Sequence, residues 1–160
     1  MKKYMTLEER ITKLEKRICE AAGRDFKVGD AIDVNAIEYM VSSILSQCDS
    51  EWLTIKTEDH TVSTYGSDVE SRLLVVSICL SYRDIGSSRK WTKTLASLCV
   101  PYSEDGIIED EYHARCINVN DKSEYNKWFS SVKTAIKAMP AVVNRWLERF
   151  NSRDDIEFTR

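Results

Sequence analysis

The hydrophobic period of this sequence changes twice along the chain, from helical to alternating and back to helical. Residues 6–22 and 31–48 place apolar side chains three and four positions apart, as on one face of a helix. Residues 51–119 mostly alternate between apolar and polar, which is typical of strands, and residues 122–150 return to helical spacing. Because the helical stretches are segregated from the strands, the sequence predicts an α+β fold. We expect two N-terminal helices, an antiparallel sheet of four to five strands, and a long C-terminal helix packed on the sheet.

The first predicted helix, residues 6–22, carries a narrow apolar seam. Thr6 and Glu9 have the spacing of a capping box, in which each side chain accepts a hydrogen bond from the other residue's backbone N–H. Gly23 is expected to end this helix, because glycine is common just after the last helical residue. The second helix has a wider apolar stripe, so it is expected to lie on the core, with Asp30 or Asp33 as its N-cap. The seam of the first helix consists of Leu7, Ile11, Leu14, Ile18 and Ala21.

The longest predicted strand is residues 71–83, SRLLVVSICLSYR, which is rich in β-branched residues. One of its faces is apolar and is expected to meet the core, while the other mixes apolar residues with Ser and Cys and is expected to be partly covered. Residues 89–102 fit either a strand or a helix. A strand is favoured because the short turn before them contains a glycine, which is typical of a hairpin. Further strands are predicted at 51–57, 62–66 and 111–119, with the charged residues 58–60 as a turn between the first two.

The last predicted helix spans residues 122–150, opens at residues 121–124, and is followed by a tail, 151–160. Its apolar residues keep an alternating four–three spacing over eight positions. Pro140 falls inside this pattern and should bend the helix, because proline lacks a backbone donor and crowds the preceding turn. The apolar residues keep the same spacing before and after Pro140. This continuity predicts one bent helix, or two nearly collinear ones, that follow a single surface.

Length and composition fit one globular domain covering residues 1–160. Of the 160 residues, 42% are hydrophobic and 31% are charged. No apolar run is long enough for a membrane span, and the basic N-terminus is not followed by the apolar core of a secretory signal. The five cysteines lie in or beside apolar runs without any C-x-x-C spacing. They are therefore expected to be reduced thiols in a cytoplasmic protein.

Basic and aromatic residues are concentrated in residues 82–93, YRDIGSSRKWTK. The whole chain has a net charge of −3, but residues 71–100 contain five basic residues and one acidic residue. Basic side chains neutralise phosphates and aromatic rings stack on bases, so a hairpin here could bind nucleic acid. It fits an acidic protein partner equally well, and the acidic charge of the whole chain weakens the nucleic-acid interpretation. The predicted partner- or nucleic-acid-binding residues are Tyr82, Arg83, Arg89, Lys90, Trp91 and Lys93.

The narrow seams of the first and last helices are typical of helix-on-helix packing. These helices could pack on each other within one chain, or against the same helices of a second copy, which would give a homodimer. Aromatic residues are enriched at binding interfaces, and several are expected on the last helix. The predicted self-association residues are Tyr125, Trp128, Phe129 and Trp146.

Neither histidine lies in a recognisable catalytic or metal-binding motif. In EYHARCINV, His113 and Cys116 would point to opposite faces of a strand, so they could not share a proton or a metal. Two-histidine phosphoesterases repeat a His-apolar-Ser/Thr-apolar motif, whereas His60 and His113 lie in HTVS and HARC, which lack the hydroxyl at that position. A phosphoesterase using these two histidines is therefore the lesser alternative. No phosphate loop, nucleophile elbow, zinc motif or calcium loop occurs, so the sequence predicts no metal and no cofactor.

These observations predict a small, non-enzymatic protein that recognises a protein partner of unknown identity, as an accessory or inhibitory factor. Nucleic-acid binding through residues 82–93 is the alternative function.

Overall fold

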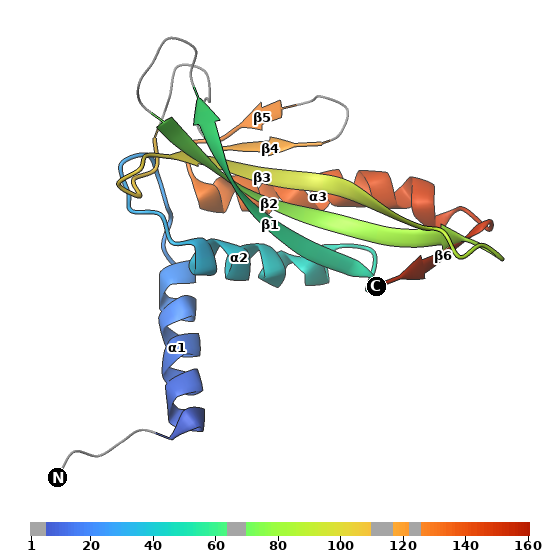
Figure 1. The fold of residues 1–160 in the computed structure, drawn as a ribbon, viewed down its shortest axis with the longest axis horizontal. Helices are drawn as coiled ribbons and strands as arrows, with labels where there is room; N and C mark the ends of the chain where they lie inside the picture. The colour runs from blue at the N-terminus through green and yellow to red at the C-terminus, as the bar shows by residue number, and fades with distance from the viewer. Residues whose placement is uncertain (1–5, 64–69, 110–116, 122–125) are drawn as a thin grey trace.

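The computed structural model describes residues 6–63, 70–109, 117–121 and 126–160, and it confirms the predicted α+β class. An antiparallel sheet runs the length of the molecule, and two of the three helices pack along it (Figure 1). The N-terminal helix points away from the rest of the chain (Figure 1).

The two N-terminal helices begin at the capping residues that the sequence predicts. At the start of α1 (Leu7–Ala22), the Glu9 N–H donates to Thr6 Oγ1 over 3.1 Å, and the Thr6 N–H donates to Glu9 Oε2 over 3.2 Å. Asp33 caps α2 (Val34–Ser43) by accepting a hydrogen bond from the Ala36 N–H. A short 3-10 helix, η1 (Ile44–Gln47), continues α2 toward the sheet.

The sheet has the order β1-β2-β3-β4-β5, and every neighbouring pair is antiparallel. Residues 89–102, which fitted either a helix or a strand, form a strand, as favoured from the sequence. Residues 58–60, predicted to be a turn, lie instead within one long strand, because their backbones pair with β2 without interruption. The strands are β1 (Leu53–Ser63), β2 (Glu70–Asp84), β3 (Lys90–Tyr102), β4 (Asn118–Asn120) and β5 (Asn126–Trp128).

The C-terminal tail forms a sixth strand, β6 (Ile156–Thr159), which the sequence did not predict. It pairs with β2 just beyond the point where β1 begins, since Leu53 pairs with Leu80 and Thr159 pairs with Ser81. β1 and β6 therefore share one edge of β2. The Arg160 side chain donates to the Glu51 carbonyl over 2.9 Å, which ties the two ends together.

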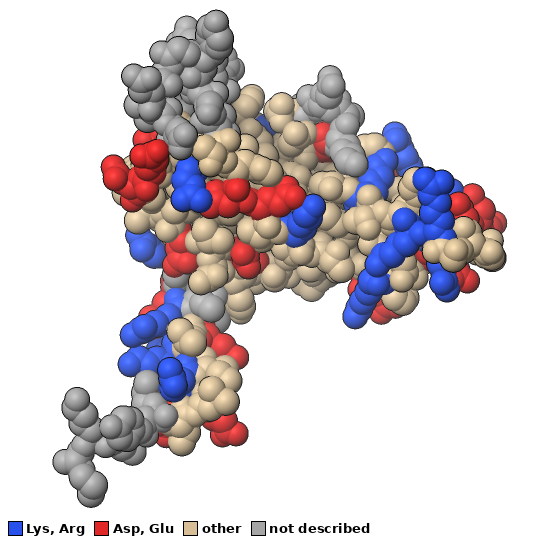
Figure 2. All heavy atoms as spheres, in the orientation of Figure 1, with Lys and Arg blue, Asp and Glu red and all other residues tan. Residues whose placement is uncertain are grey.

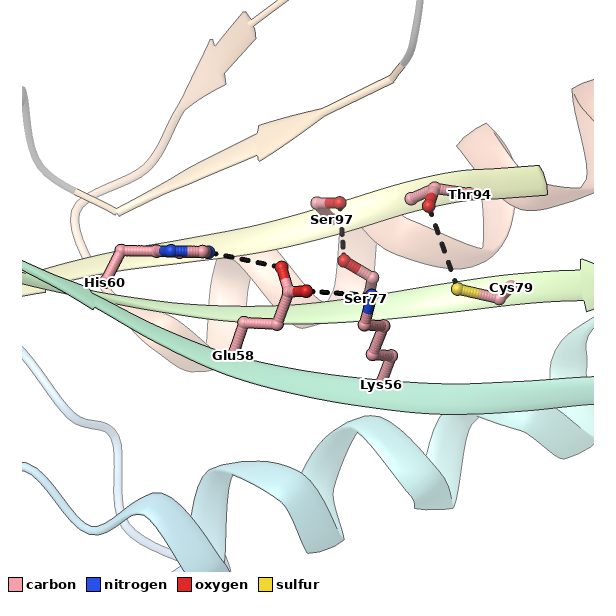
Figure 3. A network of polar contacts seen from close by, with 7 residues as sticks. All are labelled: Lys56, Glu58, His60, Ser77, Cys79, Thr94 and Ser97. Carbon is pink, nitrogen blue, oxygen red and sulfur yellow. Dashed lines mark hydrogen bonds and ion pairs between the residues drawn. The ribbon is translucent and has the colours of Figure 1, made fainter. Parts of the chain in front are cut away.

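One face of the sheet is apolar and packs against α2 and α3, as predicted for the long central strand. Four consecutive side chains that β2 presents to this face are fully buried, and they are Leu74, Val76, Ile78 and Leu80. The opposite face of β2 carries the alternate residues, including Ser77, Cys79 and Ser81. We refer to it below as the polar face (Figure 3).

The long helix α3 (Val132–Asn151) begins later than the sequence predicts. Residues 126–128 belong to β5, and Ser131 is the actual N-cap, accepting a hydrogen bond from the Thr134 N–H. The four–three pattern extended too far toward the N-terminus because Phe129, directly after β5, lies three positions before Val132 and so fits the spacing of the helix. Pro140 lies within α3, which is one uninterrupted helix across that residue.

None of the helices in the described ranges combines the length and apolar character that crossing a membrane requires.

Candidate functional site

The hairpin of β2 and β3 forms as predicted, but it divides the basic and aromatic residues between two faces. Tyr82 pairs with Trp91 and Arg83 pairs with Lys90, so these two pairs lie on opposite sides of the sheet. A β-bulge in β3 decides which residues face α3. The register shifts between Ile78 and Cys79, where Ile78 pairs with Ala96 but Cys79 pairs with Thr94.

This bulge turns Lys93 toward α3. Strict alternation from the buried Leu98 would place Lys93 on the polar face. The extra residue, Leu95, reverses the alternation, so that Lys93 pairs with the buried Leu80 on the helix-facing side. Its ammonium then lies 4.0 Å from the ring centroid of Trp146 on α3.

Around this contact lies a group of cations and rings, which we call the cation–aromatic cluster. Arg149 covers the Trp146 ring at 4.9 Å, so cations on two elements contact one indole. The rings of Tyr82 and Phe150 are 5.2 Å apart, and Arg153 lies 5.8 Å from Tyr82. Figure 2 shows basic side chains gathered at this end of the molecule. The cluster consists of Tyr82, Lys93, Trp146, Arg149, Phe150 and Arg153.

Of the cluster residues in α3 and in the segment after it, Trp146 was predicted as a self-association residue, whereas Arg149, Phe150 and Arg153 were not predicted as site residues. Arg149 and Arg153 lie far along the chain from the end of β3 at Tyr102, in a stretch interpreted only as helix and tail. Arg149 and Phe150 lie three and four positions after Trp146, which was a usable signal because this spacing puts the three residues on one side of α3, whereas Arg153 lies beyond the end of that helix.

The predicted cations on the polar face are bound by β6 and by the residue that follows it. The Arg83 guanidinium forms an ion pair with Glu157 at 2.8 Å, and the Lys90 ammonium donates to the Arg160 carbonyl oxygen over 2.9 Å. Arg89, at the turn, covers the Trp91 ring at 4.1 Å. The six predicted residues thus share one end of the molecule but do not form one continuous surface.

His60 lies on the polar face in a network with Glu58 and Lys56, all on β1 (Figure 3). Glu58 contacts Lys56 at 2.8 Å and His60 at 3.2 Å. Hydrogen bonding from Lys56, then from His60, lowers the pKa of the Glu58 carboxyl. Further along this face, Ser77 bonds to Ser97 over 2.8 Å and Cys79 contacts Thr94 at 3.8 Å.

His60 is one of the two histidines of the phosphoesterase alternative, and its described side-chain partner is Glu58. His113 and Cys116 lie outside the described residues. Within the described ranges, no three His, Cys, Asp or Glu side chains gather in a way that could hold a metal ion.

A small pocket lies between α3 and the β4–β5 hairpin, with a volume of about 280 Å³. Its apolar wall is formed by side chains such as Val119, Ala138 and Val142. Asp121, only 5% exposed, contributes a carboxylate 3.8 Å from the guanidinium of Arg145. The volume is at the lower end of the range for small-molecule sites.

The predicted self-association residues do not share one helix face. Trp128 is on β5 and is 43% exposed, and its pairing with Asn118 places it on the polar face. Phe129 follows β5 and is packed against the core, and Trp146 belongs to the cation–aromatic cluster. Tyr125 lies outside the described residues. The expectation that Trp128 lies on the last helix is therefore wrong.

Three residues of the predicted seam of α1 are exposed apolar side chains. Leu7 is 72% exposed, Ile11 46% and Leu14 56%. The main neighbour of α1 is α2, at the end where the helix joins the rest of the molecule (Figure 1). The seam thus lies along a helix that points away from the core.

Comparison with known proteins does not place the chain in a family. No protein-family model matches the sequence, and neither the curated proteins nor the solved structures include a significant match.

Proposed function

We propose that this protein is a non-enzymatic binding protein that recognises a protein partner through the apolar seam of α1, as an accessory or inhibitory factor. The observation that carries the proposal is the exposure of three consecutive seam residues, Leu7, Ile11 and Leu14. Large contiguous apolar patches on a soluble protein often mark an interaction site. Burying one such side chain contributes about 1.5–3 kcal/mol.

The form of the helix also supports this proposal. An amphipathic helix that contributes little to its own core can dock into a groove or against another helix. The capping box gives α1 a defined start, so the seam is partly organised before it meets a partner. Cys48, Cys79 and Cys99 are free thiols, which supports a cytoplasmic setting.

The test compares two substitutions that introduce the same charge on different sides of α1. Leu14→Glu places a carboxylate in the seam, while Thr12→Glu places one outside it. Tagged wild-type protein and both variants are used for quantitative capture from extracts of the source cells, together with sedimentation of the purified proteins. We expect Leu14→Glu to lose an associating protein, whether another chain or a second copy, that Thr12→Glu retains. Equal association by all three proteins, with unchanged circular dichroism, would contradict the proposal.

Nucleic-acid binding through the hairpin end is the second candidate function. Arg89 and Arg149 each cover a tryptophan ring, and neither forms an ion pair with any other described residue. Trp91 is 39% exposed, whereas Trp146 is half-buried. A guanidinium group held over an exposed ring can contact phosphates while the ring stacks on bases.

Fluorescence anisotropy with single-stranded DNA, duplex DNA and RNA, at low and at physiological salt, tests this second candidate. Binding should weaken steeply with salt. It should also be lost in the triple variant Arg89→Ala, Lys90→Ala, Trp91→Ala. Absence of binding at low salt, or equal binding by the triple variant, would exclude this function.

A further inference from the structure

We propose that the partner of the α1 seam is α1 of a second copy, and that the two helices form a short, parallel, two-stranded coiled coil. This inference rests on the proposed function, because it names the occupant of the same seam. The positions of the seam residues, the charges beside them and the placement of α1 each support it.

The seam has the residue pattern of a two-stranded coiled coil. Its intervals of four and three assign Ile11 and Ile18 to heptad position a, and Leu7, Leu14 and Ala21 to position d. Isoleucine at a combined with leucine at d favours two parallel strands over higher oligomers.

The charges on either side of the seam select the parallel orientation. Arg10 and Arg17 occupy position g, and Glu8 and Glu15 occupy position e. In a parallel pair, each g residue lies beside the e residue five positions later in the partner. Arg10 of each copy therefore lies beside Glu15 of the other copy, which gives two attractive pairs. An antiparallel pair would instead bring arginines together on one side and glutamates on the other.

These four charged side chains are available for such pairing. All of them are exposed, and none forms an ion pair with any other residue that the structure describes. Arg10 and Arg17 also line a shallow depression beside Leu14, together with Lys13. Figure 2 shows the basic side chains of α1 lying together along one side of the helix.

The length of α1 sets the strength of the association. A helix of 16 residues offers little more than two heptads, so the buried area belongs to the class of small, reversible interfaces. A short isolated helix is also marginally stable, and pairing should therefore increase its helicity. We expect a dimer that dissociates on dilution.

The first experiment measures the molecular mass of the purified full chain by sedimentation equilibrium over a dilution series. The wild type and Thr12→Glu should move from dimer to monomer as they are diluted, while Leu14→Glu should be monomeric throughout. A wild type that is monomeric at every concentration overturns this inference. If capture from cell extracts still finds a partner that Leu14→Glu loses, the proposed function stands and only the assignment of a second copy as the partner is wrong. If neither measurement finds a seam-dependent partner, both proposals fail.

Charge reversal tests the orientation. Arg10→Glu places glutamate beside Glu15 of the second copy, and Glu15→Arg places arginine beside Arg10, so each variant alone should raise the dissociation constant about three- to tenfold. A mixture of the two variants restores both attractive pairs and should form a mixed dimer of wild-type strength, detectable by native mass spectrometry. In an antiparallel pair, Arg10→Glu would lie near Arg17 of the second copy and strengthen the dimer, which would overturn the parallel assignment.

A cross-link supplies an independent measure of orientation. Ile11→Cys should form an intermolecular disulfide in a parallel pair, since equivalent a positions then face each other. The wild type, treated in the same way, shows how much cross-linking the native cysteines produce. Failure to cross-link Ile11→Cys alone, together with cross-linking in a mixture with Leu14→Cys, would show an antiparallel pair, because an a position then faces a d position of the second copy.

Discussion

The ammonium of Lys93 on β3 lies 4.0 Å from the ring centroid of Trp146 on α3, and this contact joins the sheet to the helix at the far end of the core. Lys93 reaches α3 only because the bulge at Leu95 reverses the alternation of β3. Trp146 also receives Arg149 at 4.9 Å, so two cations share one ring.

Lys93→Met should lower the free energy of unfolding by about 0.5–1 kcal/mol, because it keeps most of the aliphatic side chain and removes the cation–π attraction. Lys137→Met, at an exposed position of the same helix, is the matched control and should change stability very little. Urea unfolding followed by tryptophan fluorescence measures both. If the two variants are equally stable, the contact with Trp146 contributes nothing.

Adjacent leucines of β2 should respond very differently to truncation. Leu74 is fully buried under the helices, whereas Leu73 is half-buried on the polar face. Leu74→Ala should cost about 2–5 kcal/mol, because it removes buried apolar contacts and leaves a cavity. Leu73→Ala should cost less than about 1.5 kcal/mol. Equal losses in chemical unfolding would mean that the polar face is covered as fully as the core.

The stability of the protein should fall at high pH partly because of Tyr102. Burial first, and then its hydrogen bond to the Asp59 carboxylate, raise the pKa of Tyr102 from 10.0 to about 12. The folded protein therefore keeps the phenolic proton at a pH where the unfolded chain releases it. The resulting stability is complete below about pH 10 and is lost as the pH rises toward about 12.

Tyr102→Phe should remove this part of the pH dependence. Its midpoint of urea unfolding should decline less steeply than that of the wild type between pH 10 and about 12. Tyr39→Phe, at an exposed tyrosine, serves as the control and should follow the wild type. Parallel curves for all three proteins would argue against a raised pKa at Tyr102.

The thiols of Cys48 and Cys99 should be unreactive in the folded protein near neutral pH. Burial raises the pKa of Cys99 to about 11, and burial followed by the neighbouring Asp49 raises the pKa of Cys48 to about 11. The thiolate is the reactive form, and a rise of the pKa from 9.0 to about 11 lowers its fraction about a hundredfold. Peptide mapping after brief iodoacetamide treatment should find both residues unmodified before unfolding and modified after it. Rapid alkylation of the folded protein would show that these thiols are accessible and ionised.

The first helix and the central hairpin could be predicted from the sequence because their signals are local. Thr6 and Glu9 are three residues apart, and their reciprocal hydrogen bonds require only the first turn of α1. The hairpin follows from a short glycine-containing turn between two β-prone segments. Gly86 adopts a φ of 83°, which other residues rarely adopt.

The start of α3 could not be predicted correctly from the sequence, because an apolar residue directly after a strand also fits the spacing of the helix that follows. Phe129 fits the apolar spacing of that helix, yet the residue before it, Trp128, pairs with β4 in the sheet. β6 was missed for a related reason. Four residues carry too weak a pattern, and their strand exists only because β1 leaves part of the edge of β2 unpaired.

The sequence by itself determined the α+β class, the apolar face of β2 and the seam of α1, because each depends on side-chain period within one element. Only the tertiary structure decided which side of the sheet each hairpin residue occupies. One bulged residue, Leu95, reverses the face of every residue between it and the turn, including Lys93 and Trp91. That choice depends on how β3 pairs with β2 beneath α3, so the cation–aromatic cluster arises from packing between distant segments and not from the spacing of residues 82–93.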